Sequence, residues 1–230
     1  MNGQSVLLLK KKARSIDTAL TRLYGRKEVE HEENPLDTLV ETILSQNTTD
    51  KNSHRAFCAL KASYPKWEGM IGADARHIAS IIRSGGLAYT KARRILDALK
   101  FIKAERGRLD LDFLRKMTPR EAEAWLARMK GVGPKTRSIV LLFSLRMPAF
   151  PVDTHIHRVT KRLGLITRKT SRERAQDELA LLVPEMEFYN FHINLIEHGR
   201  AVCQSRKPKC EMCKISRLCA YYAETAATRT

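Results

Sequence analysis

The sequence predicts an all-α protein, and three observations lead to this fold class. Apolar residues recur at helical spacing through most of the 230-residue chain. Glycine, proline, asparagine or aspartate separates the periodic segments. No segment shows the strict alternation of a half-buried strand. With 43% hydrophobic residues, the chain can bury one core or two small ones, and it is too polar and too interrupted for a membrane span.

The first strongly periodic segment begins after Asn34, which is placed to cap a helix, and Pro35, which suits the first helical position. Its apolar residues are Leu36, Leu39, Val40, Ile43 and Leu44. The same spacing predicts further helices around Ile78, Ile81 and Ile82, around Ile95, Leu99 and Ile102, around Trp125, Leu126 and Met129, and around Leu179 and Leu182.

One continuous apolar run, Ile139 to Phe143, has a length that also suits a buried strand. A strand needs a partner, and the sequence offers none with an alternating pattern. We therefore expect a buried helix at these residues.

The charge balance favours a polyanionic partner. The chain carries 42 Lys and Arg against 25 Asp and Glu, a formal net charge of +17, with a pI near 9.9. Nucleic acid is the leading candidate, although anionic membranes, ribosomes and simple solubility compete for the same observation. The apolar stretch Val6–Leu9 is too short for a targeting segment and is followed by three lysines, so we expect a protein of the reducing cytosol.

Four of the five cysteines lie near the C-terminal end in the spacing C-x6-C-x2-C-x5-C, at Cys203, Cys210, Cys213 and Cys219. In a reducing compartment this pattern favours an iron-sulfur cluster or zinc over two disulfides. Structural zinc sites more often use two C-x2-C pairs, and only Cys210 and Cys213 are paired in this way. We therefore favour a 4Fe-4S cluster, with zinc as the alternative. The fifth, Cys58, is expected to pack in the core beside Phe57.

Three basic residues lie between the first two of these cysteines: Arg206, Lys207 and Lys209. A metal group that orders the loop would present them to phosphate as a basic surface.

A second motif, near the middle of the chain, reads as a helix, a tight turn and a second helix over about residues 125–143. Gly131 and Gly133 flank Val132 in the turn, and the second helix opens at Pro134 or Lys135. The glycines allow unusual backbone angles and leave amide groups exposed at a helix N-terminus, where a phosphate is favoured. Such a helix-hairpin-helix binds DNA phosphate without reading sequence, and non-catalytic proteins carry it as well.

Lys135 and Asp153 add a catalytic interpretation. A helix N-terminus disfavours an ammonium, so Lys135 is placed to act as an amine nucleophile. An amine that attacks a sugar's anomeric carbon must lose its proton while the sugar gains positive charge, and a carboxylate such as Asp153 serves both needs. Asp153 also suits the N-cap of a helix starting at Thr154, which does not exclude catalysis.

These residues resemble the helix-hairpin-helix/Gly-Pro-Asp superfamily of DNA glycosylases, and within it the endonuclease III branch with an iron-sulfur cluster. Six matches carry the resemblance in order: LSQNT (Leu44–Thr48), GGL (Gly85–Leu87), GVGPKT (Gly131–Thr136), PVDTHIHRV (Pro151–Val159), HGRAVC (His198–Cys203) and the full cysteine spacing.

The resemblance implies a two-lobed helical fold. Residues 28–147 would form a six-helix barrel-like bundle that contains the helix-hairpin-helix. Residues 1–27 together with 148–230 would form a second helical domain that carries the 4Fe-4S cluster loop. The four cysteines would be the ligands of the cluster.

The resemblance also implies roles for single residues. Lys135 corresponds to the family's Schiff-base lysine and Asp153 to its catalytic aspartate. Gln46 and Leu87 correspond to residues that fill the gap left by an everted base, and His155 to a position near the DNA backbone. Without the resemblance, Gln46 would equally cap or bridge helices, and Leu87 would equally belong to the core.

Two departures from the family pattern bear on specificity. Arg137 replaces a small residue on the second hairpin helix, so local packing or phosphate contact is expected to differ. Ala88 stands where close relatives often carry an aromatic residue that lines the base pocket, and Tyr89 follows one position later.

The expected function is base-excision repair by a monomeric, cytoplasmic and nucleoid-associated enzyme. It would remove oxidised pyrimidines from duplex DNA through a lysine Schiff base and cut the strand by β-elimination, so its partner is double-stranded DNA with damaged or abasic nucleotides. One alternative is a monofunctional or mismatch thymine or uracil glycosylase of the same fold. The other is a non-catalytic iron-sulfur protein that binds DNA.

Overall fold

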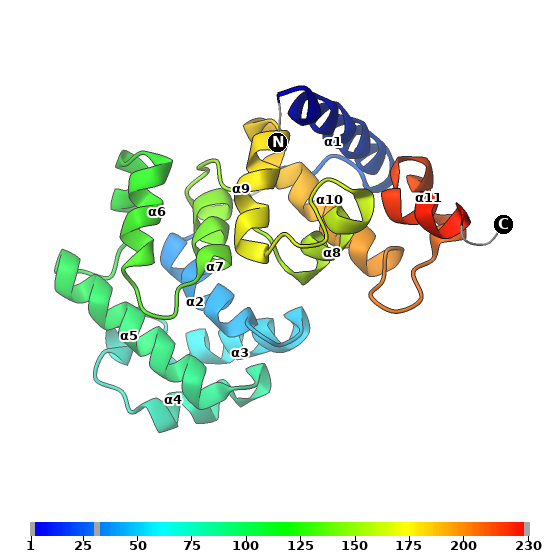
Figure 1. Ribbon diagram of the computed structural model, residues 1–230. Coiled ribbons are helices and arrows are strands. Elements are labelled where there is room, and N and C mark those ends of the chain that lie inside the picture. Colours follow the sequence, from blue (N-terminus) through cyan, green and yellow to red (C-terminus); the bar gives the residue numbers. More distant parts are fainter. Residues whose placement is uncertain (1–2, 30–32, 228–230) are drawn as a thin grey trace. The chain divides into compact units, whose positions relative to one another are not determined.

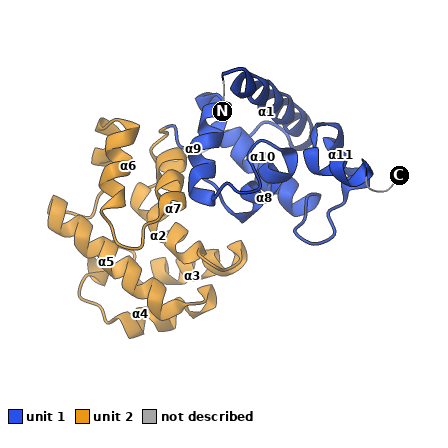
Figure 2. Ribbon diagram, viewed as in Figure 1, with its two compact units in different colours: residues 1–30, 148–230 blue, residues 31–147 orange. Residues whose placement is uncertain are grey.

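The computed structural model describes residues 3–29 and 33–227, and every regular element in these residues is a helix (Figure 1). The predicted all-α class is therefore confirmed. The described chain divides into two compact units (Figure 2). Unit 1 lies within residues 1–30 and 148–230, and unit 2 lies within residues 31–147.

Unit 2 contains six α-helices in its described part. They are α2 (Pro35–Ser45), α3 (Asp50–Ser63), α4 (Ala75–Ile81), α5 (Ala88–Arg106), α6 (Pro119–Ala127) and α7 (Pro134–Ile139). Helix α2 packs against α3, α5 and α7, so it forms the centre of the unit.

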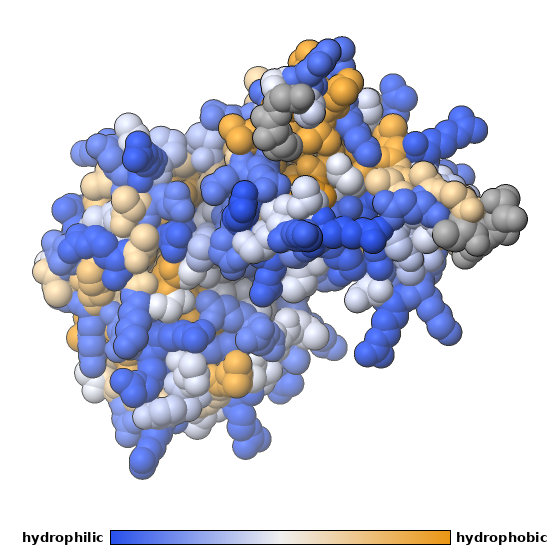
Figure 3. Space-filling view, in the orientation of Figure 1, coloured by the Kyte–Doolittle hydropathy of each residue, from blue (hydrophilic) through white to orange (hydrophobic). Residues whose placement is uncertain are grey.

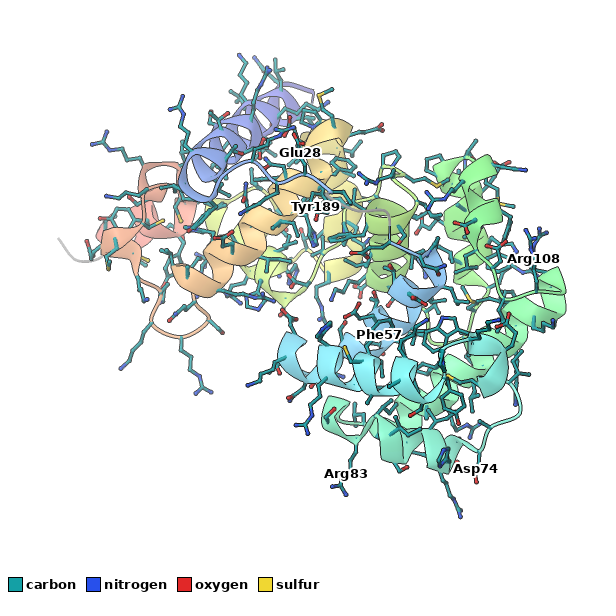
Figure 4. All side chains as sticks on the ribbon, turned by 180° about the vertical axis from the view of Figure 1, so that it is seen from behind. Glu28, Phe57, Asp74, Arg83, Arg108 and Tyr189 are labelled. Carbon is teal, nitrogen blue, oxygen red and sulfur yellow. The ribbon has the colours of Figure 1, made fainter. Side chains whose placement is uncertain are left out.

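The sequence signals that start α2 act as predicted. The side chain of Asn34 accepts hydrogen bonds from the backbone N–H groups of Leu36 and Asp37, and Pro35 occupies the first turn. All five predicted apolar positions of this helix are buried. Asp37 also accepts a hydrogen bond of 2.6 Å from the indole of Trp67, whose ring packs against Phe57 (labelled in Figure 4).

The apolar run at residues 139–143 is helical, as predicted. Helix α7 continues into a π-helical turn, Val140–Ser144, in which most side chains are buried. Its i, i+5 bonding is seen where the backbone N–H of Leu145 donates to the carbonyl oxygen of Val140 at 3.1 Å.

Unit 1 combines the N-terminal helix α1 (Gly3–Tyr24) with four helices of the C-terminal part. These are α8 (Thr154–Leu163), α9 (Arg172–Leu182), α10 (Phe188–Ala201) and α11 (Ala220–Ala227). Helix α10 packs against α1 and α8. Gly199 permits the approach of α8, because a Cβ at this position would lie 3.2 Å from side-chain carbons of His155 and Val159.

A polar network joins α1 to α10 inside unit 1. The buried amide of Asn190 donates to Asp17 Oδ1 at 2.9 Å and to Thr21 Oγ1 at 2.8 Å, and its oxygen accepts from the backbone N–H of Lys27. The long sequence separation of these partners means that folding brings the N-terminal helix to the C-terminal part.

The face seen in Figure 3 is mostly hydrophilic. Among the described helices, none combines the length and apolar character needed to cross a membrane.

Candidate functional site

The hairpin in unit 2 has the predicted turn geometry. Gly131 adopts φ +85°, a left-handed conformation that favours glycine, and Gly133 is the N-cap residue of α7. Pro134 lies at the first helical position, as expected. Glycine has no side chain to cap the helix, so the first N–H groups of α7 are left available to an anion.

Arg137 belongs to the internal structure of this hairpin. Its Nη1 donates to the carbonyl oxygen of Val132 at 3.1 Å, and its Nη2 lies 3.5 Å from a carboxylate oxygen of Glu123. The guanidinium thus ties the hairpin turn to α6.

Lys135 lies in the first turn of α7, directly after the hairpin turn, and its side chain is half-buried. Within the described residues of unit 2, its ammonium makes no hydrogen bond or ion pair. The amine is thus not committed to a structural role in this unit.

Gln46 follows α2 as its C-cap residue, and its side-chain oxygen accepts a 2.5 Å hydrogen bond from Arg94 Nη1. The aliphatic part of Arg94 lies against Gly131, where a Cβ would be 3.0 Å from Arg94 Cγ. Gln46 therefore does bridge elements, as one sequence interpretation allowed, and Arg94 joins it to the hairpin. No motif or periodicity in the sequence marks Arg94.

Leu87 is exposed and not part of the core. Its relative exposure is 59%, and it adopts the left-handed conformation with φ +47° at the start of α5. Left-handed backbone is costly for a β-carbon-bearing residue. The following residue, Ala88, is half-buried, and Tyr89 is 51% exposed.

Below this loop, Lys91 is buried with 1% relative exposure. Its Nζ donates to the carbonyl oxygens of Leu44 at 2.6 Å and Gly85 at 2.7 Å. Burial, assisted by the nearby charge of Arg94, lowers the pKa of Lys91. Lys91 thus fixes the segment before Gln46 to the segment before Leu87.

In unit 1, Asp153 is the N-cap residue of α8, and its Oδ1 accepts from the backbone N–H of Ile156 at 2.8 Å. The capping interpretation is thus confirmed, and the second carboxylate oxygen remains for other partners. Two residues later, His155 is half-buried, and its Nδ1 lies 3.2 Å from Arg158 Nη2.

The four C-terminal cysteines line one pocket of unit 1. None of them is in a disulfide. Burial raises the thiol pKa values of Cys213 and Cys219. Among the residues that the structure describes, no three His, Cys, Asp or Glu side chains meet closely enough to hold a single metal ion.

Two arginines on α8, four residues apart, hold the loop after the first cysteine. Arg158 donates to the carbonyl oxygens of Gly199 and Cys203, and Arg162 donates to those of Gln204 and Ser205. Sequence analysis missed both, although the i, i+4 spacing directly after the PVDTH motif places them on one helical face.

His198 connects the cysteine pocket to the N-terminal helix. Its Nδ1 lies 3.0 Å from the hydroxyl of Tyr24, and its Nε2 lies 3.7 Å from Cys213 Sγ. Burial lowers the pKa of His198 to about 4, so the ring is neutral at pH 7. A neutral ring that accepts from Tyr24 can donate its Nε2–H to the sulfur.

The pocket holds four thiol donors of the type that an iron-sulfur cluster requires, so its residues fit the expected group. Lys209 also lines this pocket, while Arg206 and Lys207 are exposed in the same loop. Lys207 adopts φ +50°. The loop between the first two cysteines therefore presents positive charge to solvent.

The expectation for Cys58 is wrong, because this residue is exposed. The buried face of α3 consists of Ser53, Ala56 and Leu60, and Cys58 projects from the other side. Its sulfur lies 3.5 Å from His54 Nε2.

Helix α6, the glycine turn and helix α7 form a hairpin within an all-helical unit. This arrangement places the protein in the class of helix-hairpin-helix proteins. Residues 40–185 match the family described as HhH-GPD superfamily base excision DNA repair protein. This chain therefore belongs to the HhH-GPD superfamily, and the predicted resemblance is confirmed.

Curated relatives agree with this membership. The chain is 35% identical over 193 residues to endonuclease III of Sulfolobus acidocaldarius, covering 83% of this chain and 84% of that protein. It is 42% identical over 176 residues to an Arabidopsis thaliana protein named as a candidate DNA glycosylase. That match covers 76% of this chain and 60% of the plant protein, so the chain spans less than two thirds of that relative.

Solved structures show the same fold. A trapped endonuclease III–DNA covalent intermediate is similar with a TM-score of 0.82 and 26% identity, over 94% of this chain and 98% of that chain. A thermostable thymine-DNA glycosylase is similar with a TM-score of 0.76 and 25% identity, over 93% and 98%. Together these comparisons confirm the predicted class of enzyme, a DNA glycosylase/lyase.

Proposed function

We propose that this protein removes oxidised pyrimidines from duplex DNA and then cuts the abasic strand, acting as a monomer on DNA in the cytoplasm. The observation that carries the proposal is the position of Lys135 in the first turn of α7, directly after the glycine turn. A phosphate bound by the turn would bring the sugar of a damaged nucleotide near this amine. Endonuclease III is the name of several relatives, which favours pyrimidine lesions over other substrates.

In this proposal Lys135 attacks the anomeric carbon, and the damaged base leaves with its bonding electrons. The proton that the attacking nitrogen loses is taken up by O4′ as the C1′–O4′ bond breaks, which opens the sugar ring and leaves a protonated imine at C1′. The imine acidifies a C2′ proton, and its removal breaks the C3′–O3′ bond and expels the 3′ phosphate by β-elimination. Asp153 stabilises positive charge on the sugar while one of its oxygens caps α8. Gln46 and Leu87 fill the gap left by the everted base, which an enzyme must unstack to reach its bond.

Each unit contributes residues that are expected to contact DNA. Gly131 and Gly133 offer backbone donors to phosphate, and His155 lies at the start of α8 near the proposed backbone path. The loop residues Arg206, Lys207 and Lys209 add positive charge from unit 1. We retain the domain assignment made from sequence, with residues 28–147 as the bundle and residues 1–27 and 148–230 as the cluster domain.

The first experiment is borohydride trapping of the wild type on duplexes with thymine glycol, uracil, a T·G mismatch or an abasic site. We expect a covalent adduct with wild type and with Lys130→Gln, which removes a neighbouring exposed lysine. Lys135→Gln should form no adduct and cut no strand while it still binds the duplex. Full lyase activity in Lys135→Gln would overturn the mechanism.

Other outcomes separate the alternatives. A wild type that releases thymine or uracil without an adduct is a monofunctional or mismatch glycosylase, an alternative supported by the similarity to the thymine-DNA glycosylase structure. A wild type that binds every duplex and releases no base is a non-catalytic DNA-binding protein. Asp153→Asn tests the carboxylate, because asparagine also caps helices, and it should slow base release without unfolding α8.

The pocket of Cys203, Cys210, Cys213 and Cys219 would hold a 4Fe-4S cluster through four thiolates. When bound, the cluster would order the basic loop, and we assign it no part in bond cleavage. Changing any one of the four cysteines to alanine should give colourless and poorly folded protein, since metal binding and folding are coupled. Cys58→Ala is the matched control and should keep the visible colour. Zinc in place of iron in the purified protein would favour the zinc alternative.

A further inference from the structure

Arg94 contacts two parts of the proposed DNA site in unit 2. It donates to the side-chain oxygen of Gln46 at 2.5 Å, across 48 residues of sequence. A Cβ at Gly131 would lie 3.0 to 3.4 Å from Arg94 Cγ, Cδ and Nε. Its side chain therefore spans from the end of α2 to the hairpin turn.

This contact fixes the orientation of the Gln46 amide. A guanidinium has only donors, so the atom of Gln46 that faces it must be the oxygen. The Nε2 group, with its two N–H donors, then faces away from Arg94. If the amide were flipped, its NH2 group would face the guanidinium, and two donors cannot form a hydrogen bond with each other.

The backbone around Gln46 is held as well. Lys91, one helical turn before Arg94, bonds the carbonyl oxygen of Leu44, two residues before Gln46. Two cations on one face of α5 thus hold the main chain and the side chain of this segment. Such support keeps a binding side chain in one geometry.

We propose that Arg94 is a positioning residue, which orients Gln46 so that its Nε2–H donors meet an acceptor atom on the base opposite the lesion. The inference rests on the proposed function, in which Gln46 enters the gap beside that base. Every base offers an oxygen or ring-nitrogen acceptor on its pairing edge, so a fixed donor recognises the unpaired base as a class.

Gln46 can donate to the unpaired base only after the damaged base has left the stack. Loss of Arg94 should therefore reduce the rate of base release more than it reduces affinity for undamaged duplex. A role in phosphate binding alone would instead weaken all duplexes and change the salt dependence of binding.

The test is a double-mutant cycle on single-turnover base release. Arg94→Met keeps the methylenes beside Gly131 and removes the donors, and Gln46→Ala removes the partner. We expect each single variant to lose about tenfold in rate, in line with one charged hydrogen bond. The double variant should be no slower than Gln46→Ala.

Three further variants sharpen the result. Arg93→Met removes a neighbouring exposed cation of α5 and should keep the wild-type rate. Gln46→Glu keeps an acceptor for Arg94 and has no N–H donor, so it should be as slow as Gln46→Ala. Arg94→Lys retains a donor and should recover part of the rate. Melting temperatures are measured alongside, so that a loss of rate from unfolding is recognised.

If the rate losses of Arg94→Met and Gln46→Ala multiply in the double variant, the inference is overturned. A fully active Gln46→Glu would overturn it as well. In both cases wild-type base release and the Lys135 adduct stand, so the proposed function survives. If the wild type releases no base from any duplex, the proposed function itself fails.

Discussion

Arg162 Nη1 donates a hydrogen bond to Cys203 Sγ at 3.4 Å. The same guanidinium bonds the carbonyl oxygens of Gln204 at 2.6 Å and Ser205 at 3.1 Å. One side chain of α8 therefore fixes the first cysteine of the pocket and the two residues after it. A fork of rigid donors suits this task, and a lysine could not reproduce it.

Replacing Arg162 should loosen the cysteine pocket. We expect Arg162→Met to lower the free energy of unfolding by about 1–2 kcal/mol, because several charged hydrogen bonds are lost at a partly exposed site. Denaturant unfolding monitored by circular dichroism measures this change, and the visible absorbance reports release of iron. Lys161→Met on the same helix is the control. Equal stability of the two variants would contradict a holding role for Arg162.

Lys91 should be required for the stability of unit 2. Lys91→Met fills the same volume but leaves the carbonyl oxygens of Leu44 and Gly85 without their buried donor. We expect a loss of about 2–4 kcal/mol in the free energy of unfolding. The exposed Lys100→Met on the same helix should change it by less than about 0.5 kcal/mol. A stable Lys91→Met would mean that the two carbonyl groups find other donors.

Gly131→Ala should destabilise the hairpin for two reasons that a control can separate. Gly131 and Gly107 both have left-handed backbone, with φ +85° and +71°, so alanine costs about 1 kcal/mol at either position. Only at Gly131 does the new methyl meet Arg94. We expect Gly131→Ala to lose about 1 kcal/mol or more of unfolding free energy beyond the loss in Gly107→Ala. Thermal or denaturant unfolding measures the difference. An equal loss at both positions would show that Arg94 moves aside freely.

The pKa of Asp17, raised to about 6 mainly by burial and further by the charge of Glu187, predicts a pH-dependent stability. The folded state then holds a proton that the unfolded state releases near 3.8, so stability falls as pH rises from about 4 to about 6. Asp17 is partly exposed, and we discount the effect to about 1 kcal/mol. Asp17→Asn should be more stable than wild type at pH 7, and the difference should vanish at pH 4. A constant difference in the unfolding midpoint across this range would disprove the linkage.

Local signals were enough for many elements of the fold. Asn34 and Pro35 start α2 as predicted, and Pro134 starts α7, because caps and first-turn prolines act within a few residues. The periodic apolar residues of α2 are buried because their spacing places them on one face of the helix. The motif order also indicated the superfamily, which the comparisons confirm.

Side-chain environments were less predictable. Cys58 was expected in the core and is exposed, since one apolar neighbour does not define the buried face of a helix. Leu87 is exposed although leucine is usually buried, because it sits in a left-handed turn. The roles of Lys135 and Asp153 remain predictions that rest on the family pattern and on position.

The sequence by itself determined the all-helical class, the hairpin and the set of four thiol donors, because each depends on spacing along the chain. Only the tertiary structure decided that Lys91 is buried, that Arg94 orients Gln46, and that Tyr24 reaches His198 across 174 residues. These contacts join segments far apart in sequence, and no local periodicity encodes which distant side chain completes a hydrogen bond.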